Sequence, residues 1–388
     1  MIIIKDKQLC CGCEACEQVC PQKCIIMKQD KEGFLYPEVN QMSCISCGRC
    51  DTVCPINEKS SEDRSEPIAY GGWHKDNDIR SDSSSGAAFT LFAEYILRRG
   101  GIVYGCMLNE DMEAVHVGIE SMDELYKLRG SKYVQSRING VYEQIRTYLQ
   151  NGRSILFVGT PCQAAGLHSF LGNSYENLYV IDFICHGVPS PKLFRAYIDD
   201  IEQKHGKKVT AYKFRNKDHG WNQTGIQLGT KISFQNGTDI RNYPAFRDHY
   251  MNAFLDNVCL RPSCYMCGFK DAVKYYADFT IADFWGVNHV SKKLNDGKGT
   301  SLILVHNSRA NELWEEVSKN FYYEQVDFQQ AICRNRSLIQ SAGLNNNRNR
   351  FYEELDEKGY RYVKYKYMLA LTWGIHKVMG MLKHKFRK

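Results

Sequence analysis

The sequence has no apolar run long enough to cross a membrane. No stretch of its 388 residues approaches the roughly 18 consecutive apolar residues of a membrane-spanning helix. A signal-peptide pattern is also missing, because the charge of Lys5 comes too early. The net charge of +6 is too small to indicate a nucleic-acid partner. We therefore expect a cytoplasmic protein, without nucleic acid, whose thiols are reduced or bound to metal.

Proline is scarce, with nine residues, yet Pro21 and Pro55 each follow a run of four cysteines. Both runs have the spacing C-x2-C-x2-C-x3-C of bacterial two-cluster ferredoxins, in which the fourth cysteine of each run ligates the other cluster. Zinc modules are not built from two interlocked runs of this kind. Cys11 and Cys24 are left without a role. The spacing predicts two 4Fe–4S clusters, one held by Cys10, Cys13, Cys16 and Cys54, and the other by Cys44, Cys47, Cys50 and Cys20.

The chain divides into a cysteine-rich module and a larger domain. Residues 1–56 are expected to form an α+β ferredoxin-like dicluster domain with a hairpin that turns at residues 30–33, and the polar residues 57–66 a linker. From residue 67 to 340, strands and helices alternate, which indicates an α/β domain with a mixed sheet, mainly parallel in its first half. We expect helices at 87–99, 141–150 and 192–203, and strands at 102–105, 155–158, 179–184, 209–214, 225–234, 279–284 and 302–305.

Residues 341–388 form a basic C-terminal tail. From residue 359 onward there is no Asp or Glu, and apolar residues recur at helical spacing. The pattern predicts a basic amphipathic helix. Such a helix could make peripheral contact with an anionic membrane surface, or it could dock on its own domain or on a partner.

Several cysteines outside the two runs lie at the ends of predicted strands. Cys162 follows one buried strand and Cys185 the next, so both should emerge at the carboxyl edge of a parallel sheet, where α/β folds bind ligands. Cys264 and Cys267 supply a further C-x2-C. These four could hold a third cluster, but two alternatives remain open. Cys264 and Cys267 could form a dithiol pair, or they could join Cys259 in the plant-type two-iron spacing, whose fourth cysteine would be the distant Cys333.

Six short strings identify a family resemblance. They are Ser84-Ser85-Gly86, GSKYVQS at 130–136, GTPCQ at 159–163, CHGVPSP at 185–191, RPSC at 261–264 and DFWG at 283–286. In this order they resemble the family of coenzyme F420 hydrogenase/dehydrogenase beta subunits, in the form fused to an N-terminal dicluster ferredoxin, over residues 1–340. The resemblance implies an FAD-binding α/β domain with Asp283, Trp285 and Gly286 near the flavin. It also implies a third 4Fe–4S cluster held by Cys162, Cys185, Cys264 and Cys267.

A flavin also follows from the chemistry. Iron–sulfur clusters exchange single electrons, whereas nicotinamides and reduced deazaflavins deliver hydride, so a flavin has to stand between them. The run Ser84, Ser85 and Gly86 opens a predicted helix whose N–H groups suit the FAD pyrophosphate, and Lys132 could add positive charge. The alternative is that the serines only cap the helix. Tyr133, His186 and Trp221 are further candidates for contact with the cofactors.

We expect an iron–sulfur flavoprotein oxidoreductase. It would pass electrons between a small-molecule hydride carrier (a deazaflavin or a nicotinamide) or an organic substrate and a ferredoxin or other redox partner protein. Two alternatives are a non-catalytic electron-transfer subunit and an accessory protein of surface-polysaccharide biosynthesis. Ala87 and Ala282 depart from the family pattern, since relatives often have glycine there, and each adds one methyl group near the expected flavin.

Overall fold

The computed structural model describes residues 1–57, 65–221, 228–242, 244–271 and 275–369. Most of the predicted linker therefore lies outside the described residues, as do the first part of the strand expected at 225–234 and most of the amphipathic segment of the tail. Among the residues that the structure covers, no helix is long and apolar enough to span a membrane.

The N-terminal module is a small α+β unit. Strands β1 (Ile25–Gln29) and β2 (Leu35–Val39) pair in antiparallel register. The carboxylate of Asp30 accepts hydrogen bonds from the backbone N–H groups of Glu32 and Phe34, both at 3.0 Å, and so closes the predicted turn. The short helices α1 (Ala15–Gln18) and α2 (Arg49–Thr52) each begin within one of the two cysteine runs. The hairpin is confirmed.

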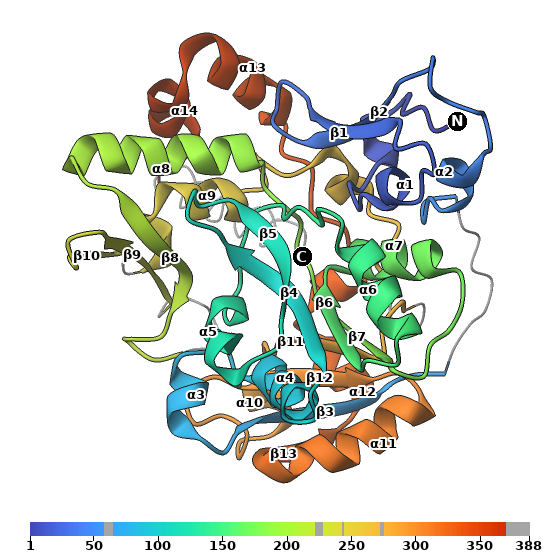
Figure 1. The fold of residues 1–388 in the computed structure, drawn as a ribbon. Coiled ribbons are helices and arrows are strands. Elements are labelled where there is room, and N and C mark those ends of the chain that lie inside the picture. Colours follow the sequence, from blue (N-terminus) through green and yellow to red (C-terminus); the bar gives the residue numbers. More distant parts are fainter. Residues whose placement is uncertain (58–64, 222–227, 243, 272–274, 370–388) are drawn as a thin grey trace, which may run out of the picture.

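The larger domain is built on an eight-stranded mixed sheet of order β13-β3-β12-β11-β7-β6-β4-β5 (Figure 1). Strands β4, β6, β7 and β11 pair in parallel, and the outer strands are antiparallel, as the mixed-sheet prediction requires. The strands are β3 (Ile68–His74), β4 (Ile102–Leu108), β5 (Ala114–Ile119), β6 (Ile155–Gly159), β7 (Leu178–Phe183), β11 (Phe279–Asp283), β12 (Ser301–Val305) and β13 (Phe321–Val326).

Helices cover both faces of this sheet. Along β6, Ile155 and Phe157 pack on one face against α6 (Val141–Gln150) and α7 (Pro161–Leu171). Leu156 and Val158 pack on the other face against α4 (Ala88–Arg98) and α11 (Ser308–Val317). Alternate residues of a strand point to opposite faces, so a continuous apolar run is what a doubly covered strand needs. The shorter helices are α3 (Asn77–Ser81), α5 (Leu125–Leu128), α10 (Val287–Val290) and α12 (Phe328–Ile332).

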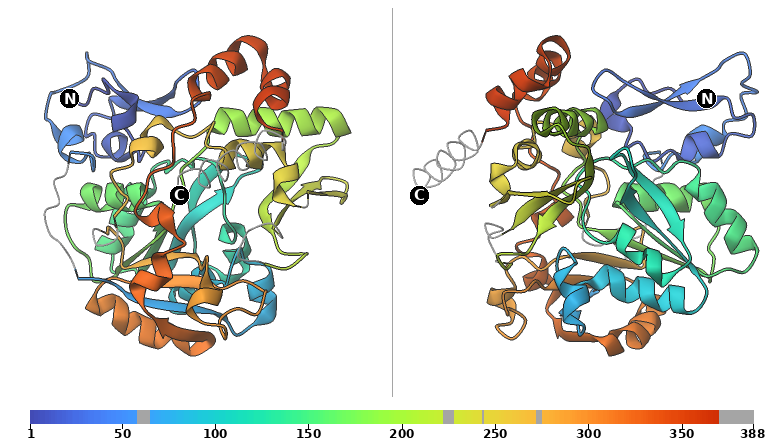
Figure 2. Two further views of the ribbon diagram at one scale, coloured as in Figure 1. Left: turned by 180° about the vertical axis from the view of Figure 1, so that it is seen from behind. Right: turned by 60° about the vertical axis from the view of Figure 1, so that its left-hand side comes forward.

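A second layer joins the sheet to the module. Strands β8 (Val209–Asn216), β9 (Gly229–Phe234) and β10 (Asp239–Asn242) form an antiparallel sheet that packs with α8 (Pro191–His205) and α9 (His249–Leu255). The N-terminal module and the helices α13 (Arg348–Lys358) and α14 (Tyr360–Tyr367) lie at the same end of the molecule (Figure 2). Helix α14 docks on α8, since Val363 is fully buried and Lys364 pairs with Asp200 at 2.7 Å. The described start of the tail thus packs on its own chain.

Candidate redox site

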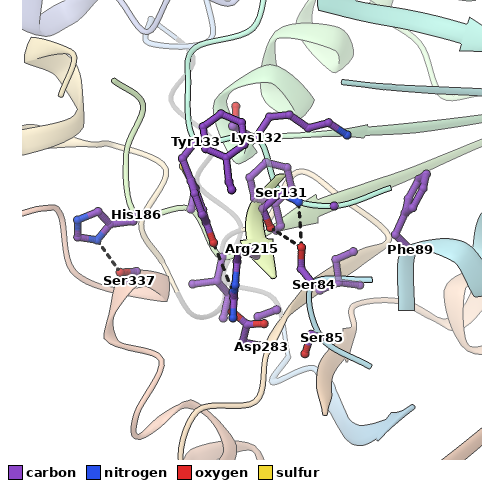
Figure 3. Close-up of a pocket in the computed structure, with 18 of the residues that line it drawn as sticks. Ser84, Ser85, Phe89, Ser131, Lys132, Tyr133, His186, Arg215, Asp283 and Ser337 are labelled. Atoms are coloured by element: carbon purple, nitrogen blue, oxygen red, sulfur yellow. Dashed lines mark hydrogen bonds and ion pairs between the residues drawn. The ribbon is translucent and has the colours of Figure 1, made fainter. Parts of the chain in front are cut away.

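A cavity of about 1020 Å³ opens at the carboxyl edge of β6, β7 and β11. Residues from five of the six family strings line it, including the serine loop (residues 83–85), the segment 130–136 and the segment 283–286. The cavity also reaches Cys162 and Cys185. Figure 3 shows side chains from these distant segments pointing toward one space. Parallel strands place the residues that follow them at one edge, so the sheet itself brings these segments together.

The serine loop is held by its neighbours and does not cap α4. Ser84 Oγ accepts hydrogen bonds from the backbone N–H of Ser131 at 2.9 Å and from its hydroxyl at 3.1 Å (Figure 3). Ser85 donates to the carbonyl of Thr300 at 2.6 Å, and the N–H of Gly86 donates to Ser301 at 3.0 Å. None of the serines caps α4, since its N-cap residue is Ala87, and the N–H of Ala88 donates to Ser301 Oγ at 3.5 Å. The alternative that the serines only cap the helix is therefore wrong, and among the described residues no side chain accepts a hydrogen bond from the N–H groups of Phe89 and Thr90, which follow Ala88 in the first turn of α4 at the cavity.

The backbone at the residue before α4 gives a reason for the glycine that relatives often have there. Ala87 has φ +70° and lies in the left-handed region. This conformation suits glycine and costs other residues about 1–2 kcal/mol. A glycine here therefore serves the backbone turn into α4. The methyl group of Ala87 is itself buried.

Lys132 is used differently from the expectation. Its Nζ donates to the carbonyls of Lys127, Leu128 and Arg129 at 3.3, 3.0 and 2.8 Å, at the end of α5. Burial lowers its pKa to about 8. Its side chain extends away from Arg215 and Asp283 (Figure 3). A direct contact of Lys132 with a phosphate stays a prediction.

Arg215, which the sequence reasoning missed, is a buried cation that lines the cavity. It forms a buried ion pair with Asp283, and its Nη1 donates to the hydroxyl of Tyr133 at 3.3 Å. Burial disfavours the guanidinium cation, but the carboxylate of Asp283 outweighs this and raises the pKa of Arg215. Its Nε and Nη2 are buried and have no hydrogen-bond partner among the described residues. Such groups are the donors that an anionic ligand would satisfy.

Aromatic rings and positive charge complete the lining. Trp285 stacks on Trp221 with ring centroids 5.1 Å apart, and Tyr133 stacks on Phe254 at 4.7 Å. The described lining residues contain one acidic side chain, Asp283, against five Lys and Arg, namely Arg129, Lys132, Arg215, Arg334 and Arg336. The cavity is therefore electropositive and suits an anion with a planar ring system.

Cys162 owes its position to the start of α7. Thr160 and Gln163 form a reciprocal capping box, and Pro161 occupies the first helical position. The thiol of Cys162 lies 3.1 Å from the hydroxyl of Thr160. The helix thus begins directly at the cavity and holds this cysteine at its edge.

The other cysteines expected for a third cluster gather around Cys162. Burial and the neighbouring Cys185 and Cys162 thiols raise the pKa of Cys264. Burial also raises the pKa of Cys185 to about 12, with Cys162 and Cys267 as further causes. The N–H of Val188 donates to Cys264 Sγ at 3.4 Å. The four thiols are thus near enough to affect one another's ionisation, although no three His, Cys, Asp or Glu side chains in the described parts converge closely enough for a single metal ion.

Cys259 does not belong to this group. It is fully buried in an apolar core beside Tyr250 and Tyr352, and burial raises its pKa. Cys333 is exposed. These placements give the plant-type alternative no support.

The two extra cysteines of the dicluster module lie against expected ligands. The thiol of Cys11 contacts those of Cys13 and Cys162. Its hydrogen bond to Cys13 and its burial raise the pKa of Cys11. Cys24 Sγ lies 3.4 Å from Cys20 Sγ. Cys11 therefore bridges the module and the cavity.

The fold and the site define an iron–sulfur redox protein, in which a dicluster module is joined to an α/β domain with further cysteines at its cavity. The model of the 4Fe-4S dicluster domain matches residues 9–57. Models of the N-terminal and C-terminal parts of the coenzyme F420 hydrogenase/dehydrogenase beta subunit match residues 69–143 and 152–331. The chain belongs to this family, as the strings implied, and its role is a redox one.

Two curated proteins are similar to parts of the chain. A subunit of the F420H2 dehydrogenase of Methanosarcina mazei is 26% identical over 187 residues, which cover 45% of this chain and 51% of that protein. The coenzyme F420-dependent sulfite reductase of Methanocaldococcus jannaschii is 26% identical over 189 residues, 48% of this chain and 29% of that protein. The matches thus span about half, or less, of these relatives.

One solved structure is also similar. A chain of the F420-reducing NiFe hydrogenase complex from Methanosarcina barkeri gives a TM-score of 0.45 at 15% identity, covering 80% of this chain and 94% of that chain.

Proposed function

We propose that this protein is an FAD-dependent iron–sulfur oxidoreductase that exchanges electrons between a hydride carrier at the cavity and a protein partner at the dicluster module. The observation that carries the proposal is that one cavity of about 1020 Å³ is lined both by the start of α4 and by Cys162 and Cys185. A ligand that accepts two electrons together would then lie next to a cluster that accepts them one at a time.

The chain's own residues fit the FAD group. The N–H groups that follow Ala88 in the first turn of α4 suit a pyrophosphate, which the helix dipole also favours. The unpaired donors of Arg215 can bind a second anionic or carbonyl group of the ligand. FAD, when bound, supplies the conversion between hydride and single electrons. Trp285 and Tyr133 would hold and orient its rings within the cavity.

The cysteine positions fit a further cluster. Cys162, Cys185 and the pair Cys264 and Cys267 come from three segments of the chain, and each thiol is near enough to the others to affect their ionisation, which supports this assignment. A third 4Fe–4S cluster would use these four thiolates. The dicluster module would keep its own eight ligands in the interlocked arrangement.

The proposal is tested by anaerobic purification followed by denaturation, which should release FAD in about equal molar amount to the chain. Reduced deazaflavin, NADH, NADPH and reduced ferredoxin are then added in turn to the holoprotein, and the carrier that bleaches the flavin is the electron donor. A preparation with full iron content that holds no flavin would refute the proposed conversion between hydride and single electrons.

A second candidate is an electron-transfer subunit whose substrate chemistry lies on another chain. The observation in its favour is that one of the relatives is a subunit of a dehydrogenase. The matched region spans 51% of that subunit. Steady turnover by the isolated chain with a soluble carrier and a ferredoxin would argue against it. Turnover that appears only after a co-purifying chain is added would support it.

A further inference from the structure

Arg261 is a fully buried arginine at the contact between the dicluster module and the larger domain, with 0% of its surface exposed. Its backbone precedes the short helix Pro262–Met266, which contains Cys264. Its side chain reaches the other way, into the module: Nε donates to the carbonyl of Cys10 at 2.8 Å, and Nη2 lies 3.5 Å from Cys10 Sγ. One residue thus touches an expected ligand of the first cluster and stands three positions before one of the third.

The guanidinium lacks a conventional counter-ion. Its remaining hydrogen bonds go to Gln135 Oε1 and the carbonyl of Leu35, both at 2.9 Å, so its partners among the described residues include no carboxylate. A buried cation without a negative partner is costly. Among its hydrogen-bond partners, the group that becomes an anion as a metal ligand is the Cys10 sulfur, 3.5 Å from Nη2. A thiolate-ligated cluster at Cys10 would supply the missing countercharge.

The local sequence makes room for this contact. Gly12, at φ +72°, lies in the same cysteine run, and a Cβ added there would come within 2.8 Å of Arg261 Nη1 and 2.5 Å of Gln135 Nε2. The module therefore leaves space at this glycine for a charged group from the other domain.

We propose that Arg261 sets the reduction potential of the cluster ligated by Cys10, by placing a fixed positive charge and an N–H donor on its ligand sulfur. Reduction adds one negative charge to a cluster, and a buried cation stabilises the reduced form more than the oxidised form. Arg261 thereby makes the cluster ligated by Cys10 easier to reduce than the other cluster of the module. The inference rests on the proposed cluster ligands and goes beyond them by assigning a role to a residue that binds no iron.

The structure offers a matched control. Arg348 is a second buried arginine that joins the two parts of the chain, but its partner is a carboxylate: Nη1 and Nη2 bind Glu32 at 3.0 and 2.5 Å. Its Nε donates to the carbonyl of Leu260 at 3.0 Å. Loss of Arg348 weakens the same interface without removing a charge from a ligand thiolate.

The test is an anaerobic redox titration of the holoproteins, followed by the electron paramagnetic resonance signals of the reduced clusters. In Arg261→Met the midpoint of one cluster should fall by at least about 59 mV, a tenfold change in its reduced-to-oxidised ratio, while Arg348→Met leaves it unchanged. Gln135→Glu keeps the arginine but neutralises it, and should shift the same midpoint in the same direction. If Arg261→Met does not fold or does not take up its clusters, the midpoint in Gln135→Glu tests the role of Arg261.

Unchanged midpoints in these variants, or an equal fall in Arg348→Met, would overturn the role of Arg261. If the wild-type protein itself lacked iron, the proposed function would be refuted. If the wild type holds its full iron content and the midpoints of the variants do not move, only the role of Arg261 is refuted.

Discussion

Replacing Gly166 of α7 by alanine should destabilise the protein. In an ordinary helix interior this change stabilises a protein by about 1 kcal/mol. Here a Cβ would lie 2.8 Å from Cys13 Cβ and 3.1 Å from Cys13 Sγ, across the contact between α7 and the module. Carbon atoms in contact are normally about 3.5–4.0 Å apart, so α7 or Cys13 would have to move by roughly 1 Å.

The two effects have opposite signs, and their sizes decide the outcome. Overpacking of this kind costs about 1–3 kcal/mol, because Cys13 Cβ is fixed to the backbone and cannot rotate away. The helical gain of about 1 kcal/mol leaves a net destabilisation of up to about 2 kcal/mol. The displaced thiol should also lose its cluster, which is about a third of the iron if three 4Fe–4S clusters are present.

The assay is the iron content per chain after anaerobic purification, together with the rate at which urea abolishes the visible iron–sulfur absorption. Gly166→Ala should hold less iron and lose its absorption faster than the wild type. Thr147→Ala is the control, since Thr147 is exposed on the neighbouring α6 and gains helix propensity without contacting a cysteine. If Gly166→Ala keeps all its iron and resists urea better than the wild type, the contact between α7 and Cys13 is not what the structure shows.

Three further outcomes are expected. Cys264→Ala should lose about a third of the iron, whereas Cys259→Ala, in the apolar core, should keep it all; equal losses would contradict the ligand assignment. Arg215→Met should weaken FAD binding by about 10- to 150-fold, because a charge-assisted hydrogen bond contributes about 1.5–3 kcal/mol, and an unchanged FAD titration would exclude its role. Burial raises the pKa of Asp182 to about 7, so the folded protein binds its proton more tightly and stability should fall as pH rises from about 4 to 7. Asp182→Asn should remove that fall, measured as thermal inactivation against pH.

The parts that sequence could predict are those with local causes. Ligand spacing is a property of a short segment, so the dicluster module and its hairpin follow from the cysteine runs. The parallel strands β6 and β7 are short apolar runs that end at cysteine strings. Strand β3 was missed because Gly71 and Gly72 interrupt its apolar pattern. In β13, two exposed tyrosines hide the alternation of a half-buried strand.

The charges of the site depend on distant contacts and could not be predicted. Arg215 lies within an irregularity in the pairing of β8 with β9 and pairs with Asp283, which is distant in the sequence. Arg261 is part of a recognised string, but its burial depends on the space left by Gly12 in another domain. In both cases the sequence shows the arginine but does not show which distant residues it contacts in the folded chain.

The proposed clusters would form one path for electrons, with an inner end at the cavity and an outer end on the dicluster module. At the inner end, Cys162 lines the cavity and contacts Cys11, which in turn contacts Cys13 of the module. At the outer end, Cys47 is exposed, and Met42, five residues earlier in the chain, has 96% of its surface exposed. Electron transfer weakens steeply with distance, so a protein partner would have to approach the outer end, while a small hydride carrier would enter the cavity. The inner and outer ends would therefore serve different partners, and a variant at Met42 should slow exchange with a ferredoxin without changing flavin reduction by the carrier.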